Sequence, residues 1–283
     1  MELTNFEAYK QAEETLKKAG VSFSKSEIYG ILIKINGFKN YTDLVVHMDE
    51  NLANPEYFLE IVNDLASNIP PQYALKSAPF LNYDFYVDKR VLIPRPETEE
   101  LVADLVNFIF NNYKIEPQTI ADICTGSGCI AISLKNYFPN SKVYGSDVSK
   151  DALDVAKMNA DKYKTDVTFV ESDKLKYFID NKIKFDVLVS NPPYVEKMED
   201  IDDNVKNFEP LNAIYVKDGT EFYEDYFKHH KEIMNDNFLM AFEINYDQEE
   251  KLTFLIQKYF SEDTNFFFRN DSFGKTRYLY IFK

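Results

Sequence analysis

The sequence lacks the residues and segments that mark several large classes of protein. Its only cysteines, Cys124 and Cys129, lie in one short segment without a nearby histidine set. They form no disulfide framework and no zinc pattern, so we expect no metal and a reducing compartment. No uncharged apolar run approaches the ~20 residues of a membrane helix, and Glu2–Thr4 is unlike the start of a signal peptide. We therefore expect a cytoplasmic protein that has no membrane partner.

An excess of positive charge is also missing. Lys and Arg together number 32 against 47 Asp and Glu, so the formal net charge is −15. Binding to bare nucleic acid depends on basic side chains that replace counterions at the phosphates, which disfavours nucleic acid as a partner. The chain does contain 45% hydrophobic residues, including 20 Tyr and 24 Phe but no Trp. This content is sufficient for a globular core.

The 283 residues favour a small domain beside a larger one. Residues 1–75 place apolar side chains at helical spacing, with Gly20 as one stop, which predicts a small all-α helical domain. Residues 76–96 alternate in part between apolar and polar side chains around Phe80–Asp88, which is typical of a β-hairpin linker.

Residues 97–283 alternate helices and apolar strands, the pattern of a parallel sheet with crossover helices. We predict helices at 99–110, 128–137 and 150–161, and strands at 119–123, 142–146, 167–170, 185–190, 238–244, 264–269 and 277–282. The last two strands lack a helix between them and should form an antiparallel hairpin at the sheet edge. The predicted fold class is therefore α/β with a doubly wound sheet.

The first candidate binding element is a glycine-containing turn between a strand and a helix. It consists of Cys124, Thr125, Gly126, Ser127 and Gly128. Glycines let the backbone approach a ligand, and the helix N-terminus presents free N–H groups to a negative group such as a carboxylate. The turn lacks the third glycine of a dinucleotide site. It indicates a ligand site, with a plain strand-to-helix turn as the alternative.

Two aspartates follow the next strands. Asp147 ends its strand about 20 residues beyond the glycines, where a carboxylate can accept hydrogen bonds from ribose hydroxyls. The alternative is a helix N-cap, because Ser149 and Asp151 open a helix. Asp173 stands at the end of the third strand and is a candidate for the amino group of adenine, with a surface turn as the alternative.

The decisive element is Asn191-Pro192-Pro193-Tyr194, which follows the strand 185–190. An amide nitrogen is a poor nucleophile, so two acceptors must hold its hydrogens while its lone pair is aimed at a methyl group. The Asn191 side-chain oxygen and the Pro192 carbonyl are two such acceptors. The prolines fix the backbone, and the Tyr194 ring offers a face for a planar group. A turn without catalysis is the alternative.

These pieces meet if the strand 119–123 is central and the strand 185–190 is its neighbour. Ligands of doubly wound sheets bind outside the carboxyl ends of the strands, where the strand order reverses. The glycine turn and Asn191 would then face one crevice, which would bring a methyl donor next to a nitrogen acceptor.

The sequence resembles the protein-glutamine N5-methyltransferases that act on peptide chain release factors. The resemblance spans nearly the whole chain and is carried by Pro71–Tyr73, Val91–Glu99, Thr125–Gly128, Asp147, Asn191–Tyr194, Glu209-Pro210, Asp218-Gly219 and Glu243-Ile244. It implies a Rossmann-like catalytic domain, a helical substrate-recognition domain and a hairpin between them. It also implies S-adenosylmethionine as the donor, S-adenosylhomocysteine as its product, and the Gly-Gly-Gln glutamine of release factors as the substrate.

Two positions depart from the family pattern. Cys124 replaces the usual first glycine of the turn, so we expect a backbone conformation there that is open to other residues. Lys174 follows Asp173 where the family often has a large apolar or aromatic residue near the cofactor base. These departures keep a non-catalytic binding module as one competing hypothesis. N6-adenine methylation of DNA or RNA is another, because those enzymes share the Asn191–Tyr194 tetrapeptide.

Overall fold

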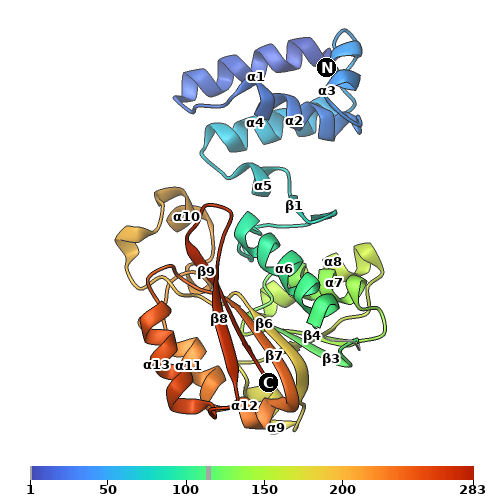
Figure 1. Ribbon diagram of the computed structural model, residues 1–283. Helices are drawn as coiled ribbons and strands as arrows, with labels where there is room; N and C mark the ends of the chain where they lie inside the picture. Colours follow the sequence, from blue (N-terminus) through green and yellow to red (C-terminus); the bar gives the residue numbers. More distant parts are fainter. Residues whose placement is uncertain (1, 113–115) are drawn as a thin grey trace. The chain divides into compact units, whose positions relative to one another are not determined.

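The computed structural model describes residues 2–112 and 116–283, and the chain divides into two compact units, Met1–Ser77 and Ala78–Lys283 (Figure 1). The first unit is helical and consists of α1 (Asn5–Ala19), α2 (Lys25–Asn36), α3 (Tyr41–Val46), α4 (Pro55–Ala66) and α5 (Pro71–Ala74). Gly20 and Gly37 end α1 and α2 in the left-handed conformation, in which glycine is favoured.

The first two helices of this unit begin at well-formed caps. The Thr4 hydroxyl accepts from the Glu7 backbone N–H, and the Glu7 carboxylate accepts from the Thr4 N–H in return. Ser24 and Glu27 repeat this arrangement at α2. Behind the caps, buried apolar side chains form a core of this unit's own, which includes Leu16, Leu32 and Phe58.

The second unit begins with a short antiparallel hairpin, β1 (Ala78–Phe80) and β2 (Tyr83–Phe85). Phe80 and Phe85 are fully buried in the core of this unit. The division of the chain falls at residues 77 and 78, and α6 (Pro96–Asn112) already starts at Pro96. A proline suits this position, because the first helical N–H has no partner in the helix. The assignment of 1–75, 76–96 and 97–283 to separate roles stays a prediction.

A seven-stranded mixed sheet organises the second unit, in the order β5-β4-β3-β6-β7-β9-β8. The strands are β3 (Thr119–Ile123), β4 (Lys142–Asp147), β5 (Thr168–Glu171), β6 (Phe185–Ser190), β7 (Met234–Glu243), β8 (Asn265–Asn270) and β9 (Thr276–Phe282). The predicted α/β fold class is confirmed, and so is the antiparallel pairing of the last two strands at the sheet edge.

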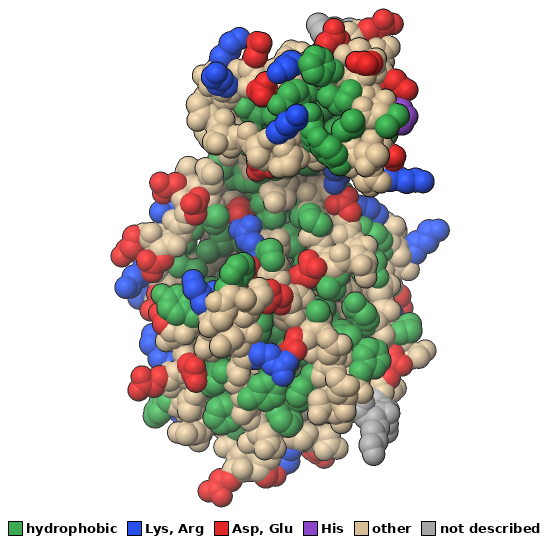
Figure 2. Space-filling view, turned by 45° about the horizontal axis from the view of Figure 1, so that its top comes forward, with side chains coloured by type: hydrophobic (Ala, Val, Ile, Leu, Met, Phe, Trp, Pro, Cys, Tyr) green, Lys and Arg blue, Asp and Glu red, His purple; other side chains and the backbone are tan. Residues whose placement is uncertain are grey.

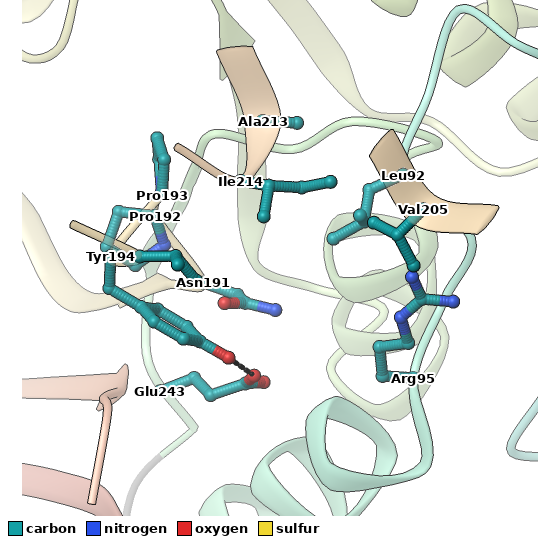
Figure 3. A pocket seen from close by; sticks show the side chains of 11 residues that line it. Leu92, Arg95, Asn191, Pro192, Pro193, Tyr194, Val205, Ala213, Ile214 and Glu243 are labelled. Carbon is teal, nitrogen blue, oxygen red and sulfur yellow. Dashed lines mark hydrogen bonds between the residues drawn. The ribbon is translucent and has the colours of Figure 1, made fainter. Parts of the chain in front are cut away.

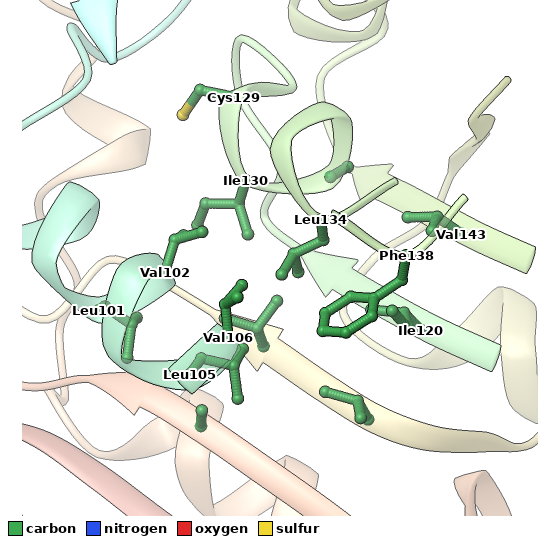
Figure 4. Packing of buried hydrophobic residues seen from close by; sticks show 14 of the residues in the cluster. Leu101, Val102, Leu105, Val106, Ile120, Cys129, Ile130, Leu134, Phe138 and Val143 are labelled. Carbon is green, nitrogen blue, oxygen red and sulfur yellow. The ribbon is translucent and has the colours of Figure 1, made fainter. Parts of the chain in front are cut away.

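Helices cover both faces of this sheet. One face packs against α6, α7 (Cys129–Tyr137) and α8 (Lys150–Tyr163), and Figure 4 shows side chains of α6 and α7, among them Leu105 and Leu134, gathered beside the strands. The other face packs against α9 (Lys176–Asp180), α11 (Glu221–Lys228), α12 (His230–Ile233) and α13 (Glu249–Tyr259). Neighbouring residues of a strand, such as Ile120 and Ala121 of β3, point to opposite faces.

Several helices escaped the sequence-based prediction. They are α3, α5, α9, α11, α12 and α13, together with α10 (Asp203–Phe208) and the 3₁₀ turns η1 (Met198–Asp200) and η2 (Leu211–Ala213). Many are a single turn or two, too short to show a helical period. None of the helices in the described ranges is both long and apolar enough to cross a membrane.

The packing of α13 gives a test of the core between this helix and the sheet. Leu252 is fully buried under this helix, whereas Phe254 on the same helix is 65% exposed. We expect Leu252→Ala to lower the free energy of unfolding by about 2–5 kcal/mol, because it removes buried methyl groups and leaves a cavity. Phe254→Ala should change it by less than about 1 kcal/mol. Chemical denaturation measures both, and equal losses would contradict the assignment of the buried face.

Candidate active site

Two turns that carry candidate residues follow neighbouring strands in the middle of the sheet. β3 and β6 pair in parallel, and Ile123 lies opposite Ser190. Cys124 and Asn191 therefore leave the sheet side by side, at the carboxyl ends of both strands. The chain runs from β3 outward to β4 and β5, then returns to β6 on the other side. The predicted switch point between these two strands is confirmed, and it is where such sheets bind ligands.

A pocket of about 700 Å³, open to solvent, lies at this switch point. The residues predicted from the sequence that line it are Cys124, Gly126, Asp147, Asp173, Lys174, Asn191 and Pro193. Thr125 and Ser127 are buried behind its wall and shape the turn. Gly128 also lies behind it, and a side chain there would press against Ala156 of α8. We refer to this cavity as the donor pocket.

The backbone of the glycine turn is left-handed at three positions. The φ angles are 64° at Cys124, 53° at Gly126 and 80° at Gly128. Our expectation for Cys124 is therefore wrong, because its φ lies in the region that favours glycine. Its sulfur lies 3.7 Å from the Tyr226 hydroxyl, and burial raises the pKa of the thiol to about 12. Cys124 is thus a neutral packing residue with a strained backbone.

Asp147 joins the turn to the next strand. One carboxylate oxygen accepts from the Gly126 N–H at 3.0 Å, and the other accepts from the Ser149 N–H at 2.9 Å. The N-cap of α8 is Ser149, whose hydroxyl accepts from the Ala152 N–H, so Asp147 does not fill that alternative role. Burial raises the pKa of Asp147. Each of its oxygens can accept a further hydrogen bond, and Asp147 lines the pocket.

Asp122 supports the turn from below and was not among the predicted site residues. Its Oδ2 accepts from the Thr125 hydroxyl at 2.5 Å and from the Ala131 N–H at 3.1 Å. Its Oδ1 has no hydrogen-bond partner among the described residues. Burial raises the pKa of Asp122 to about 7. Its place directly before the turn was visible in the sequence, but its full burial was not.

The far wall of the donor pocket contains an aromatic ring that sequence reasoning missed. Phe222 lies at the start of α11, a helix that the periodicity did not reveal, and it lines the pocket. The Lys174 ammonium lies 4.7 Å from the centre of this ring and 3.3 Å from the Glu221 carboxylate. Lys174 thus holds α11 against the pocket. Position 174 lacks the aromatic side chain that the family often has there, and Phe222 supplies an aromatic surface in its place.

A second pocket of about 400 Å³ shares Asn191 and Pro193 with the first (Figure 3). We call it the acceptor pocket. Asn191, Pro192, Pro193 and Tyr194 all line it, so the structure brings the whole predicted tetrapeptide to one site. No peptide bond in the described residues is cis, so the bonds preceding both prolines are trans.

The two predicted acceptor oxygens are available. No residue in 2–112 or 116–283 donates a hydrogen bond to Asn191 Oδ1 or to the Pro192 carbonyl. The nitrogen end of the Asn191 amide, by contrast, donates to Thr98 Oγ1 at 2.9 Å. The Tyr194 hydroxyl donates to Glu243 Oε1 at 3.1 Å, the contact drawn in Figure 3. The amide plane and the tyrosine ring are therefore both held from behind.

The wall of the acceptor pocket opposite the tetrapeptide is fixed by an ion pair. The Arg95 guanidinium donates to Glu209 Oε1, and the Ile93 N–H donates to Glu209 Oε2 at 3.0 Å. Glu209 is only 6% exposed, so the pair ties Ile93-Pro94-Arg95 to the loop after β6. The resemblance motifs at these positions thus meet in space. In the described residues, no group of three or more His, Cys, Asp or Glu side chains is arranged to hold a metal ion.

Comparisons with known proteins agree with this geometry. Residues 104–223 match the family model of the methyltransferase small domain. The chain is 34% identical over 261 residues to a release factor glutamine methyltransferase from Bacillus anthracis, covering 90% of this chain and 91% of that protein. It is 35% identical over 266 residues to the Bacillus subtilis protein of the same name, covering 91% and 90%.

A solved structure supports the fold of this chain. A 16S rRNA methyltransferase from T. thermophilus, in complex with AdoMet and guanosine, aligns with a TM-score of 0.52 at 14% identity. The alignment covers 73% of this chain and 49% of that one. At such low identity the likeness concerns the fold alone.

The close packing around Gly219 gives a test of the acceptor pocket. A Cβ atom there would lie 2.8 Å from the Tyr194 carbonyl oxygen and 2.7 Å from the Gln248 amide nitrogen. We expect Gly219→Ala to displace Tyr194 and to lower methyl transfer at least about tenfold. Gly30→Ala is the matched control, because nothing lies within 4 Å of its added methyl group. Equal activities of the two variants would contradict the packing argument.

Asp122 gives a pH-dependent test of stability. Its folded pKa of about 7 lies above the unfolded value near 3.8. The folded protein therefore binds this proton more tightly, and the resulting stability is present below about pH 4 and lost as pH rises through 7. Relative to wild type, Asp122→Asn should gain roughly 2–4 kcal/mol of unfolding free energy between pH 4 and 8. Denaturation across pH measures this difference, and parallel curves would contradict it; Asp161→Asn on the surface of α8 controls for the substitution itself.

Proposed function

The chain belongs to the release factor glutamine methyltransferases, and we propose that its two pockets hold the methyl donor and the substrate glutamine of that reaction. The enzyme transfers a methyl group from S-adenosylmethionine to the side-chain amide nitrogen, N5, of a glutamine in peptide chain release factors. We further propose that this glutamine is the one in the Gly-Gly-Gln tripeptide. We also propose that the protein acts in the cytoplasm, because its substrates are release factors of translation termination.

The donor pocket has residues suited to each part of S-adenosylmethionine. The Asp147 carboxylate would accept hydrogen bonds from the ribose hydroxyls, and the turn from Cys124 to Gly128 would hold the methionine part near the start of α7. Asp173, Lys174 and Phe222 would surround the adenine. When bound, S-adenosylmethionine supplies a methyl group on a positively charged sulfur, and S-adenosylhomocysteine remains after transfer.

The acceptor pocket addresses the poor nucleophilicity of an amide. Asn191 Oδ1 and the Pro192 carbonyl would accept the two hydrogens of the glutamine amide, which fixes its plane and aims the nitrogen at the donor pocket. Tyr194 would pack on the face of that plane. One proton leaves the nitrogen after methyl transfer, so no strong base is needed before it. The single observation that carries this proposal is the pair of acceptor oxygens without a donor among the described residues: Asn191 lines both pockets, and Pro192 lines the acceptor pocket beside it.

Charge supports a protein substrate over a nucleic acid. The net charge is −15, and on the face shown in Figure 2 the Lys and Arg side chains are scattered among Asp and Glu side chains. A base-flipping enzyme would need a basic approach surface. Adenine methylation is therefore the competing hypothesis, and the assay that supplies DNA or RNA beside a release factor tests it.

Asn191→Ala tests the proposed mechanism. We expect kcat to fall by about 10²-fold or more, because one of the two acceptors is lost, while the affinity for S-adenosylhomocysteine changes by only a few-fold. Mass spectrometry of a purified release factor should find one added methyl on the tripeptide glutamine with wild type and almost none with the variant. Calorimetry measures the affinity.

Asn181→Ala, an exposed change at the end of α9, is the matched control and should methylate normally. Normal methylation by Asn191→Ala would refute the mechanism. Label appearing only in DNA or RNA supplied beside the release factor would refute the substrate. Wild-type protein that neither binds S-adenosylhomocysteine nor methylates anything would favour the non-catalytic alternative.

A further inference from the structure

We propose that Thr98 and Glu243 are positioning residues that set which end of the Asn191 amide faces the substrate. This inference rests on the proposed function, because it concerns the orientation of an acceptor in the same site. An asparagine amide has an acceptor oxygen and a donor nitrogen of nearly the same shape. Only one of its two orientations presents an oxygen to the glutamine amide, so the reaction depends on whatever selects it.

The selection follows from counting donors and acceptors. An ionised carboxylate only accepts hydrogen bonds, and a threonine hydroxyl has a single proton to donate. Thr98 Oγ1 lies 2.6 Å from Glu243 Oε2, so that proton is committed to the carboxylate. The remaining lone pairs of the hydroxyl can only accept. The group facing it at 2.9 Å must therefore be the donor end of Asn191, which leaves Oδ1 turned away from Thr98.

The same carboxylate orients the second substrate-facing side chain. Glu243 Oε1 accepts from the Tyr194 hydroxyl, so one carboxylate holds Tyr194 directly and Asn191 through Thr98. Glu243 is 2% exposed and Thr98 is 3% exposed, which keeps water from replacing either contact. In a water-poor site such charged hydrogen bonds are stronger than at the surface.

Glu243 is itself held by regular structure. It ends β7 and pairs with Tyr278 of β9, and its backbone carbonyl accepts from the Tyr223 hydroxyl at 2.7 Å. Thr98 lies in the first turn of α6. The orientation of Asn191 is thus determined by α6 and β7, two segments that are far apart in the sequence, and neither of them is required to touch the substrate.

Thr98→Val and Thr98→Ser separate this role from simple packing. Valine keeps the shape of threonine but cannot accept from Asn191, whereas serine keeps the hydroxyl. We expect Thr98→Val to lower kcat on the release factor by about 10- to 100-fold. KM for the release factor and the affinity for S-adenosylhomocysteine should change less than about threefold. Thr98→Ser should stay within about threefold of wild type in every constant.

Glu243→Gln tests whether the Glu243 carboxylate fixes the direction of the hydrogen bonds of Thr98 and Tyr194. Its amide has donors of its own, so Thr98 and Tyr194 can no longer both donate to it. We expect a fall in kcat of at least about tenfold, again with nearly unchanged donor affinity. Because these variants also lose stability, each is compared by thermal unfolding and assayed well below its melting temperature.

Thr119→Val is the matched control. Thr119 also donates to a carboxylate, that of Asp186 at 3.2 Å, but it lies at the opposite end of β3. It should lose stability without losing kcat. The proposal is overturned if Thr98→Val turns over like wild type, if Thr98→Ser is as defective as Thr98→Val, or if Thr119→Val loses as much kcat. Failure of wild type to methylate the release factor would instead refute the proposed function.

Discussion

The site depends on the parallel pairing of β3 with β6. Ile123 and Ser190 face each other across this pair, so the residues that follow them emerge at the same edge of the sheet. One strand leads into the glycine turn and the other into Asn191. A shift of one residue in this register would turn the side chains of β6 to the wrong faces and move Asn191 away from the turn. The relation between the two pockets therefore follows from backbone hydrogen bonds in the core.

A buried carboxylate is the second constraint. Removing the Glu243 charge from water is costly, and burial raises the pKa of Glu243, while the hydroxyls of Thr98 and Tyr194 and the charge of Arg277 oppose that rise. These partners come from α6, from the turn after β6 and from β9. A buried polar group with its partners in place specifies one arrangement of the segments that supply them. The same contacts that stabilise the carboxylate thus fix the catalytic turn.

Sequence reasoning was most successful where a local pattern has a local cause. The strands of the sheet lie close to their predicted positions. The signals that predict them, short apolar runs and glycines at the ends of elements, depend only on residues a few positions apart. It failed at Cys124, where the turn between β3 and α7 has a left-handed backbone at a residue that does not favour it. It also missed Phe222, because α11 has only eight residues, which is short for a pattern to identify a helix.

The sequence by itself determined the fold class, the strands of the sheet and the tetrapeptide with its two acceptor oxygens, since each of these depends on residues that are close together in the chain. Only the tertiary structure decided that Asn191, Thr98 and Glu243 form one hydrogen-bonded chain, although its two bonds join residues 93 and 145 positions apart. It also decided that the Asn191 oxygen is the free end of its amide. The physical reason is that donors and acceptors can be matched only after packing has removed water and brought distant strands and helices together.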